Sequence, residues 1–339
     1  MTGRIRTAVV GVGHFGRYHA DKLANLKGSE LIAVCDTDRE RAGAVAAKLG
    51  VRAVSDYREL LDQVDAVSVV VPTTAHRQIA GPFLENGVHV LVEKPITDNL
   101  ADADALIRMA GQRGLILQVG HLERFSAAVQ VVEKVLTRPL YIECYRIAPF
   151  QPRGTDISVI LDLMIHDIDL ILAFVKSPAE SVDAVGAPVL TAVEDIANTR
   201  IRFANGCVAN ITASRISGKN ERKMRIFQPD HYISIDFLTR KVVVARKGEG
   251  ELFPGVPNFH IDEQVYEETD SLEREIEAFL NAVATKSPPP VSGEDGRRAL
   301  ETAIMITGSL QKHLEFVRAR SGDTGIAQTM VSAKRPAAQ

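Results

Sequence analysis

The chain has 339 residues, and at roughly 150 residues per domain this length predicts two domains. Its 40 Lys and Arg residues against 43 Asp and Glu residues leave a formal net charge of -3, which gives no electrostatic basis for binding nucleic acid or a membrane surface. No apolar run is long enough to cross a bilayer and the N-terminus lacks the apolar core of a signal peptide, so we expect a cytoplasmic protein without membrane insertion.

Short runs rich in Val and Ile alternate with helical patterns from residue 5 to about residue 121, which is typical of a parallel sheet with crossover helices. Six parallel strands make a complete dinucleotide-binding domain. We therefore predict a Rossmann domain, with a doubly wound parallel sheet, over residues 1–121. Its predicted strands are Ile5–Val10, Leu31–Cys35, Val51–Val54, Val67–Val71, Val88–Val92 and Leu115–Val119.

The first strand runs directly into a glycine-rich turn, Gly11-Val12-Gly13-His14-Phe15-Gly16, that opens a helix. Gly11 would permit the sharp turn, Gly13 would let the backbone approach a pyrophosphate, and Gly16 would let helix and strand pack closely. The helix N-terminus would then face the anion. We expect all three glycines, with His14 and Phe15 between them, to bind the cofactor.

Asp36 lies at the end of the second strand, where a carboxylate can accept hydrogen bonds from the adenosine ribose hydroxyls. Because this carboxylate also repels a 2′-phosphate, the sequence predicts NAD rather than NADP. Arg39 and Arg41 lie nearby and could bind that phosphate, so the use of both cofactors stays open.

The fourth and fifth predicted strands end at the sheet edge where the cofactor must lie. An ammonium beside the nicotinamide can hydrogen-bond the reacting hydroxyl and stabilise its developing alkoxide, and we assign this role to Lys94. The plain alternative is a surface lysine, but Pro95 fixes the backbone here, could be cis, and favours a held position. The residues expected to bind the cofactor at this edge are Thr73, His76, Glu93 and Lys94.

The pattern changes after residue 121, and we predict a second domain of α+β class, with a mostly antiparallel sheet, over residues 122–320. Ile196–Phe203 and Val208–Ser214 flank an Asn-Gly turn, which supplies positive φ angles and predicts an antiparallel hairpin. Residues 321–339 are expected to be a disordered tail. The other predicted elements are strands Tyr232–Phe237 and Lys241–Ala245 and helices Ser271–Ala284 and Gly296–Arg318.

Ile160 to Leu170 is predicted to be a helix that is apolar nearly all round and hence buried. At about 100° per residue, Asp162, His166 and Asp169 form one polar stripe, which favours a functional site over a core histidine bonded to a carbonyl. We predict His166 as general base, oriented by Asp162, with Lys94 as the alternative acceptor of the hydroxyl proton. A divalent metal on the stripe is the second interpretation, but hydride transfer needs none, and we expect none.

These residues resemble the glucose-fructose oxidoreductase, inositol dehydrogenase and rhizopine-catabolism family, Gfo/Idh/MocA. Its pattern of a glycine fingerprint, Glu-Lys-Pro and Asp-x-x-x-His maps onto Gly11–Gly16, Glu93-Lys94-Pro95, and Asp162 with His166. The resemblance spans nearly the whole chain. It implies Lys94, Asp162 and His166 as the catalytic group, and a large antiparallel sheet whose open face makes homodimers or homotetramers.

Many members carry glycines before the catalytic Asp and two residues after it, where this chain has Ser158-Val159-Ile160-Leu161 and Met164, so its cleft is expected to differ. The run Gly120–Phe125 and the segments around residues 152–156 and 162–169 resemble the subgroup acting on nucleotide sugars. That resemblance implies oxidation of the 3-hydroxyl of a UDP-sugar, such as UDP-N-acetylglucosamine, to a ketone on the route to a 2,3-diamino sugar of lipid A.

Arg124 and Arg153 are expected to bind this substrate together with His166. A second group of basic residues could bind the diphosphate of the UDP-sugar instead, or could lie in a solvated loop between strands. These residues are Arg215, Lys219, Arg222 and Lys223.

Two other functions stay open. The substrate could be a free polyol or inositol. Alternatively, the protein could be a non-enzymatic NAD-responsive regulator, which would keep the glycine turn and Asp36 but would have no use for an Asp-His stripe.

Overall fold

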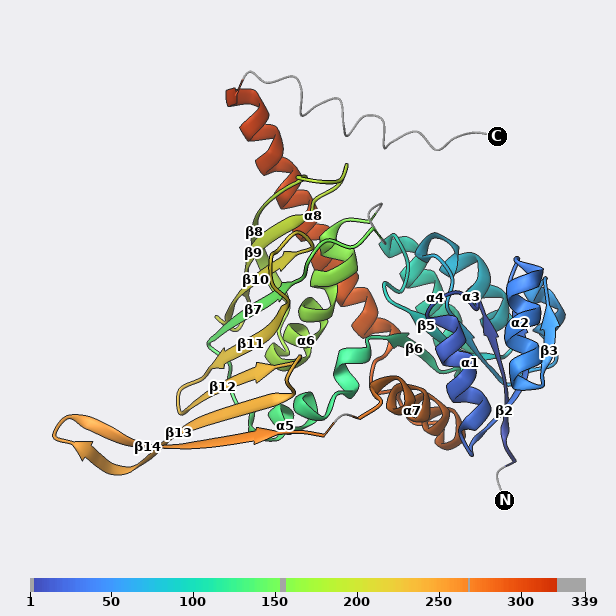
Figure 1. The fold of residues 1–339 in the computed structure, drawn as a ribbon, viewed down its shortest axis with the longest axis horizontal. Coiled ribbons are helices and arrows are strands. Elements are labelled where there is room, and N and C mark those ends of the chain that lie inside the picture. The colour runs from blue at the N-terminus through green and yellow to red at the C-terminus, as the bar shows by residue number, and fades with distance from the viewer. Residues whose placement is uncertain (1–2, 153–156, 268, 322–339) are drawn as a thin grey trace. The chain divides into compact units, whose positions relative to one another are not determined.

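A computed structural model describes residues 3–152, 157–267 and 269–321, and the chain divides into two compact units (Figure 1). The first unit comprises Met1–Ser126 with Asp270–Leu300, and the second comprises Ala127–Thr269 with Glu301–Gln339. The two units thus differ from the predicted continuous domains, because a late segment joins the first unit. The predicted tail, residues 321–339, lies outside the described residues except for residue 321.

Within the described ranges, six parallel strands form the sheet of the first unit, in the order β3-β2-β1-β4-β5-β6. The order reverses between β1 and β4, as in a doubly wound dinucleotide-binding fold. All six predicted strands are confirmed, with bounds that shift by no more than two residues. They are β1 (Ile5–Val10), β2 (Ser29–Cys35), β3 (Arg52–Val54), β4 (Ala66–Val69), β5 (His89–Glu93) and β6 (Leu117–Gly120).

Local capping chemistry sets the helix ends in this unit. Asp38 accepts a hydrogen bond from the Arg41 N–H at the start of α2 (Arg39–Leu49), and Gly50 ends that helix with a φ of 69°. The other helices are α1 (Gly16–Asn25), α3 (His76–Glu85), α4 (Leu100–Arg113), α7 (Ser271–Thr285) and the short turns η1 (Tyr57–Leu60), η2 (Thr73–Ala75) and η3 (Leu122–Phe125).

Helix α7 belongs to the first unit because its apolar face joins the core of the parallel sheet. Ile276 and Phe279 pack in one buried cluster with Val9 and Val34. At the start of α7, the Lys22 ammonium of α1 lies 2.9 Å from a Glu273 carboxylate oxygen. Burial of the apolar side chains, at about 25 cal/mol per Å², is the main reason that this late segment folds onto the N-terminal sheet.

An eight-stranded sheet builds the second unit, in the order β14-β13-β12-β11-β7-β10-β9-β8 among the residues described. All neighbouring pairs are antiparallel except β7 and β10. The mostly antiparallel sheet that was predicted is therefore confirmed. Its strands are β7 (Tyr141–Ile147), β8 (Ala179–Ala187), β9 (Ile196–Phe203), β10 (Val208–Ser214), β11 (Glu221–Phe227), β12 (His231–Asp236), β13 (Lys241–Phe253) and β14 (Val256–Val265).

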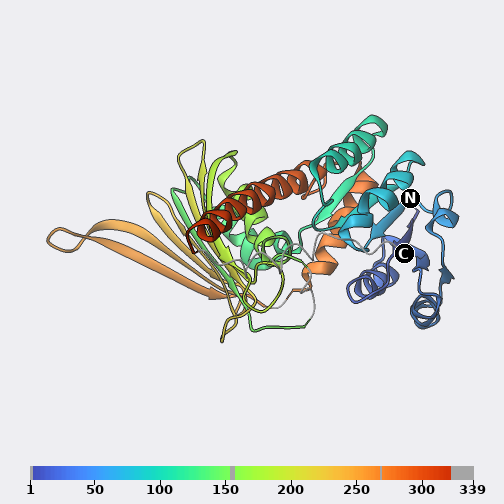
Figure 2. The same ribbon diagram turned by 90° about the horizontal axis from the view of Figure 1, so that it is seen from above.

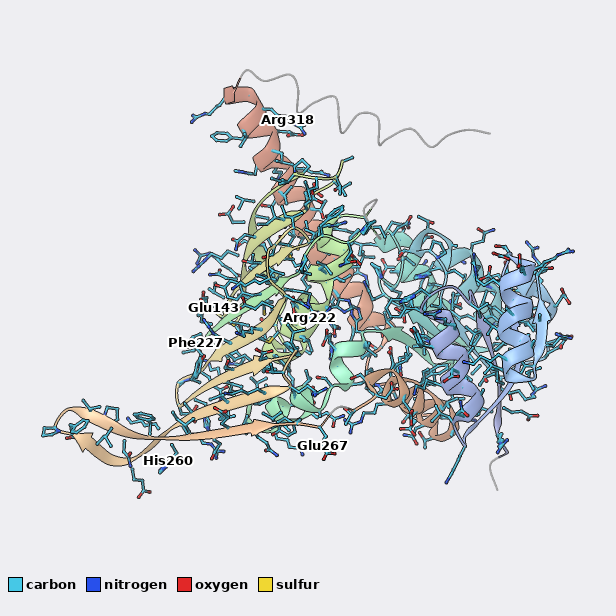
Figure 3. All side chains as sticks on the ribbon, in the orientation of Figure 1. Glu143, Arg222, Phe227, His260, Glu267 and Arg318 are labelled. Carbon is cyan, nitrogen blue, oxygen red and sulfur yellow. The ribbon has the colours of Figure 1, made fainter. Side chains whose placement is uncertain are left out.

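Helices cover one face of this sheet. Figures 1 and 2 show α6 (Ile165–Val175) against that face, and the Ala184 N–H of β8 donates to the Ser309 hydroxyl of α8 (Gly293–Ser321) at 3.0 Å. Helix α5 (Ala127–Val135) also belongs to this unit. Glu143 and Phe227 lie on the opposite face, where they are labelled in Figure 3. No helix in the described part of the chain is long and apolar enough to span a membrane.

The predicted hairpin at Asn205-Gly206 is confirmed with the bounds expected for β9 and β10. The turn itself differs from the prediction, because Gly206 has a positive φ of 87° and Asn205 does not. The Gly206 N–H donates to the Phe203 carbonyl, so one glycine in the left-handed region closes the turn.

The hairpin of β13 and β14 was largely missed, since only Lys241–Ala245 was expected as a strand. Strict alternation of apolar and polar residues ends near Ala245, and both strands beyond it are mostly exposed. Figure 2 shows this pair extending past the rest of its sheet. Two paired strands that bury neither face show no alternation of apolar and polar residues in the sequence, so this pattern could not predict them.

Candidate functional site

The turn after β1 leaves space for a phosphate group. Gly11 has a φ of 86°, and a Cβ atom there would overlap the Val70 carbonyl oxygen. A Cβ atom on Gly16 would overlap the Gly11 carbonyl oxygen, whereas one on Gly13 would have no neighbour within 4 Å. The first and third glycines are thus required by the backbone, and the open space at Gly13 fits the approach of a pyrophosphate.

His14 and Phe15 are exposed beside this turn. Their rings meet edge to face with centroids 5.5 Å apart, and Phe15 is 47% exposed. An aromatic surface next to a helix N-terminus suits the predicted contact with a cofactor, which stays a prediction.

Asp36 is held at the carboxyl end of β2 by the neighbouring backbone. Its carboxylate accepts hydrogen bonds from the Val12 and Asp38 N–H groups, each at 3.0 Å, and only 7% of the residue is exposed. The Arg41 guanidinium lies 3.2 Å from the same carboxylate. Asp36 is therefore an oriented acceptor beside the glycine turn, with a cation next to it.

Glu93 ends β5 and takes part in a buried hydrogen-bonded chain. His19 of α1 is fully buried, with Nδ1 2.8 Å from the Ser68 hydroxyl and Nε2 3.1 Å from Glu93 Oε1. Glu93 Oε2 accepts the Lys94 N–H at 3.3 Å. Burial alone would raise the pKa of Glu93, but the hydrogen bond and charge of His19 and the charge of Lys94 hold that pKa below its ordinary value. The carboxyl is thus ionised at neutral pH.

The prediction that His76 binds the cofactor directly is not supported. Its side chain is fully buried, with Nδ1 2.9 Å from the Pro95 carbonyl oxygen and Nε2 2.9 Å from that of Val71. Both ring nitrogens therefore face main chain, a direction that sequence spacing could not reveal. Thr73 opens η2 and is half-buried.

Lys94 is half-buried directly after β5, and its peptide bond to Pro95 is cis. In a parallel sheet the carboxyl ends of all strands lie at one edge. The first unit therefore brings the glycine turn, Asp36, Glu93 and Lys94 to the same edge of the sheet, as predicted from the strand order.

In the second unit, the expected helix begins with a wide π-turn, Ile160–Met164, that leads into α6. The wider turn departs from the uniform 100° spacing on which the predicted stripe depends, and the stripe stays a prediction. Asp162 and His166 are half-buried, whereas Asp169 is only 1% exposed. Across the residues described, no three His, Cys, Asp or Glu side chains gather into a metal-binding group.

Asp167, which sequence reasoning did not single out, forms a buried ion pair. The Arg146 guanidinium of β7 donates to both Asp167 carboxylate oxygens, each at 2.9 Å. Both residues are 3% exposed. A bidentate pair of this kind fixes α6 against the sheet next to His166. The available signal was an arginine at an inward position of an alternating strand.

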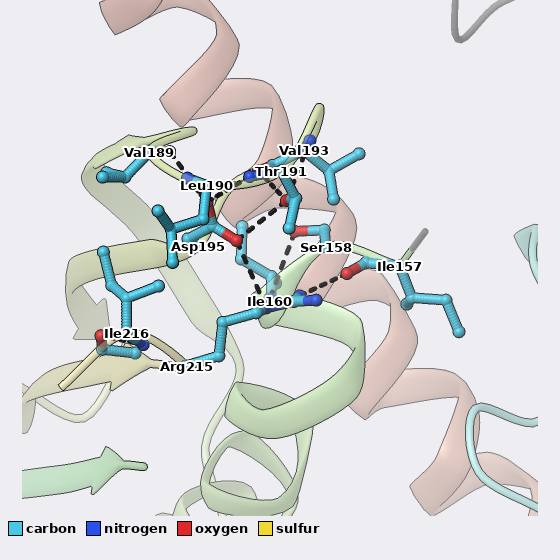
Figure 4. Close-up of polar contacts among 11 residues, drawn as sticks. Ile157, Ser158, Ile160, Val189, Leu190, Thr191, Val193, Asp195, Arg215 and Ile216 are labelled. Atoms are coloured by element: carbon cyan, nitrogen blue, oxygen red, sulfur yellow. Dashed lines mark hydrogen bonds and ion pairs between the residues drawn. The ribbon is translucent and has the colours of Figure 1, made fainter. Parts of the chain in front are cut away.

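The segment before Asp162 is tied down by a second polar cluster (Figure 4). Asp195 accepts the Leu190 and Thr191 N–H groups and lies 3.8 Å from the Arg215 guanidinium. Arg215 also donates to the Ile157 carbonyl oxygen. This network holds the chain where it enters the π-turn.

The second predicted basic set does not form one anion clamp. Arg215 is 6% exposed and serves the cluster just described. Lys219 pairs with Glu221 at 2.6 Å. Arg222 and Lys223 are successive residues of β11, so they point to opposite faces of the sheet, and Arg222 lies on the side of α6 (Figure 3).

Arg124, the predicted substrate-binding residue of the first unit, lies in η3 with its side chain 13% exposed, 3.9 Å from Asp295. Arg153 lies outside the described residues. The substrate contacts of both arginines stay predictions.

Known protein families match both units. Residues 5–121 match the model of an oxidoreductase family with an NAD-binding Rossmann fold, and residues 145–231 match the GFO/IDH/MocA C-terminal domain. A UDP-N-acetylglucosamine 3-dehydrogenase of Acidithiobacillus ferrooxidans is 42% identical over 92% of this chain and 99% of its own length. A solved structure of that dehydrogenase superposes with a TM-score of 0.86, at 41% identity, and covers the same shares of the two chains. A scyllo-inositol 2-dehydrogenase (NAD(+)) of Bacillus subtilis is 28% identical over 95% of this chain and its full length.

Proposed function

Because this chain belongs to the Gfo/Idh/MocA oxidoreductase family, we propose that it oxidises a ring hydroxyl of a UDP-sugar to a ketone with NAD. The preferred substrate in this proposal is UDP-N-acetylglucosamine, oxidised at its 3-hydroxyl for a 2,3-diamino sugar of lipid A. The observation that carries the proposal is the 42% identity to a dehydrogenase of that substrate over 92% of the chain. The inositol dehydrogenase, at 28%, supports the alternative substrate less well.

The residues of the first unit fit the cofactor. Open space at Gly13 admits the pyrophosphate, and the Asp36 carboxylate can accept the ribose hydroxyls. When bound, NAD supplies the acceptor for the substrate hydride.

The protein's own groups would handle the proton of the reacting hydroxyl. The Lys94 ammonium donates a hydrogen bond to the hydroxyl oxygen and stabilises the negative charge that develops there. His166 accepts the hydroxyl proton, and Asp162 orients the imidazole.

Asp36→Asn is expected to shift the cofactor preference toward NADP. The change removes the negative charge that repels a 2′-phosphate and weakens acceptance from the ribose hydroxyls, while Arg41 remains beside the site. Since a hydrogen bond to a charged group contributes about 1.5–3 kcal/mol, the ratio of kcat/KM for NAD to that for NADP should fall at least about tenfold. Asp21→Asn is the matched control, because it removes a carboxylate whose contact with Lys48, at 3.5 Å, is a surface ion pair. An unchanged ratio in Asp36→Asn would refute the assignment.

The substrate is tested by following absorbance at 340 nm with NAD and a panel of UDP-N-acetylglucosamine, free N-acetylglucosamine and inositols. We expect turnover with the UDP-sugar and competitive inhibition by UDP of protein saturated with NAD. Absence of UDP binding at millimolar concentration would exclude the nucleotide sugar and favour a free polyol. If no compound is turned over and no NADH is retained on the protein, the result would favour the non-enzymatic NAD-responsive regulator.

We further propose a homodimer or homotetramer in the cytoplasm. The sheet face opposite α6 presents neighbouring aromatic rings, with centroids 5.6 Å apart for Tyr141 and Phe227 and 5.1 Å apart for Phe227 and Tyr232. Exposed aromatic surface of this kind supports an interface with a second copy. The cysteines within the described residues are all buried free thiols, which fits a reducing compartment.

A further inference from the structure

Two fully buried histidines flank the segment Glu93-Lys94-Pro95. His19, in the first turns of α1, contacts Glu93 with Nε2 at 3.1 Å. His76, the first residue of α3, contacts the Pro95 carbonyl oxygen with Nδ1 at 2.9 Å. Each histidine thus contacts one neighbour of Lys94, and both have no exposed surface.

Each imidazole also has a second contact that anchors it to β4 or to the residues after it. His19 Nδ1 lies 2.8 Å from the Ser68 hydroxyl of β4, and His76 Nε2 lies 2.9 Å from the Val71 carbonyl oxygen just beyond that strand. The Nε2–H of His19 can donate to the Glu93 carboxylate, while the Ser68 hydroxyl contacts the other ring nitrogen. His19 therefore connects β4 to Glu93, whereas His76 lies between the Val71 and Pro95 carbonyl oxygens and, as a neutral ring, donates to one of them.

The Glu93 carboxylate is further confined from β6. A Cβ atom on Gly120 would lie 2.9 Å from Glu93 Oε1, so the carboxylate occupies the space that a side chain would take there. Glu93 in turn accepts the Lys94 N–H. Buried polar groups that are fully hydrogen-bonded give a site a defined geometry, because breaking any contact leaves an unsatisfied group in the interior.

We propose that His19 and His76 are positioning residues, which fix the backbone on both sides of Lys94 so that its ammonium meets the reacting hydroxyl. This inference rests on the proposed function of Lys94. Neither ring reaches solvent, so neither acts on the substrate itself. A core histidine with a purely structural role would stabilise the fold without a selective effect on turnover.

The test compares kcat, KM for the sugar and the Kd of NAD in His19→Leu and His76→Phe, which remove the hydrogen bonds at similar bulk. Small displacements of a reacting group can lower the rate by up to about a hundredfold. We therefore expect kcat to fall about tenfold or more in each variant, whereas KM for the sugar and the Kd of NAD should change by less than about threefold. His19→Gln and His76→Gln keep one donor and should recover part of the loss. His89→Gln is the matched control, since His89 begins the same strand at its far end and should leave kcat unchanged.

A double-mutant cycle with Lys94→Met tells the two proposals apart. If both histidines act through Lys94, His76→Gln should lower the residual rate of Lys94→Met by less than about twofold. Full activity of Lys94→Met alone would overturn the role of Lys94. The positioning role alone would be overturned if Lys94→Met loses activity while the four histidine variants fold and keep the wild-type kcat. These variants are His19→Gln, His76→Gln, His19→Leu and His76→Phe. Equal losses with and without Lys94 would also overturn it.

Discussion

Lys94→Met is expected to lower kcat by about a hundredfold or more while NAD still binds. Methionine keeps most of the bulk of the side chain but provides no charge and no donor for the developing alkoxide, and loss of one such donor typically lowers kcat by about 10²–10³. The glycine turn and Asp36, which form the proposed cofactor site, are unchanged in this variant. Steady-state kinetics with UDP-N-acetylglucosamine, together with a calorimetric titration of NAD, measures both quantities.

The control for this variant is Lys48→Met, which removes an ammonium that is 75% exposed near the end of α2. Its contact with Asp21, at 3.5 Å, is a surface ion pair that contributes little, so its kcat should equal that of the unmodified protein. If Lys94→Met turns over at nearly the same rate as this control, Lys94 is a surface lysine at a strand end and not a catalytic group.

His166→Ala is the second variant for which we expect a loss of about a hundredfold or more in kcat, again with NAD binding retained. Removal of a positioned general base typically costs about 10²–10⁴ in rate. Asp162→Asn should cost less, because it leaves the imidazole in place and weakens only its orientation. The measurement is the pH profile of kcat/KM, in which the rise with pH that a general base produces should be absent from His166→Ala.

His313→Ala serves as the control, because His313 lies on α8 and belongs to none of the proposed sites. A near-wild-type rate and an unaltered pH profile in His166→Ala would show that the proton leaves by another route. If Lys94→Met is inactive in the same assay, Lys94 would then take the proton as a neutral amine and stabilise the alkoxide as the ammonium so formed.

Side-chain direction limited the prediction of individual site residues. His76 follows a strand that ends at the cofactor edge, and this position suggested a direct contact, yet its imidazole turns into the core and meets two carbonyl oxygens. Arg215 stood among other cations in the chain but is buried against Asp195. A residue's place in the sequence determines which element carries it, but the rotamer depends on neighbours that are distant in the chain.

The partners of the buried polar groups could not be predicted for the same reason. Glu93 was recognised within Glu-Lys-Pro, but its link through His19 to Ser68 joins three separate elements. The ion pair of Arg146 with Asp167 likewise connects β7 with α6. Such pairs leave no periodic pattern, because each member alone looks like an isolated polar residue in an apolar run.

The local sequence by itself determined the six strands of the parallel sheet, the glycine turn with Asp36 after it, and the place of Lys94 at a strand end, because each depends on short-range periodicity or backbone sterics. Only the tertiary structure decided that Asp270–Leu300 joins the first unit, that Asp162 lies in a π-turn ahead of α6, and that His19 and His76 flank the Lys94 segment. These outcomes depend on burial and hydrogen bonding between residues far apart in the chain, whose pairing is settled when the whole core packs.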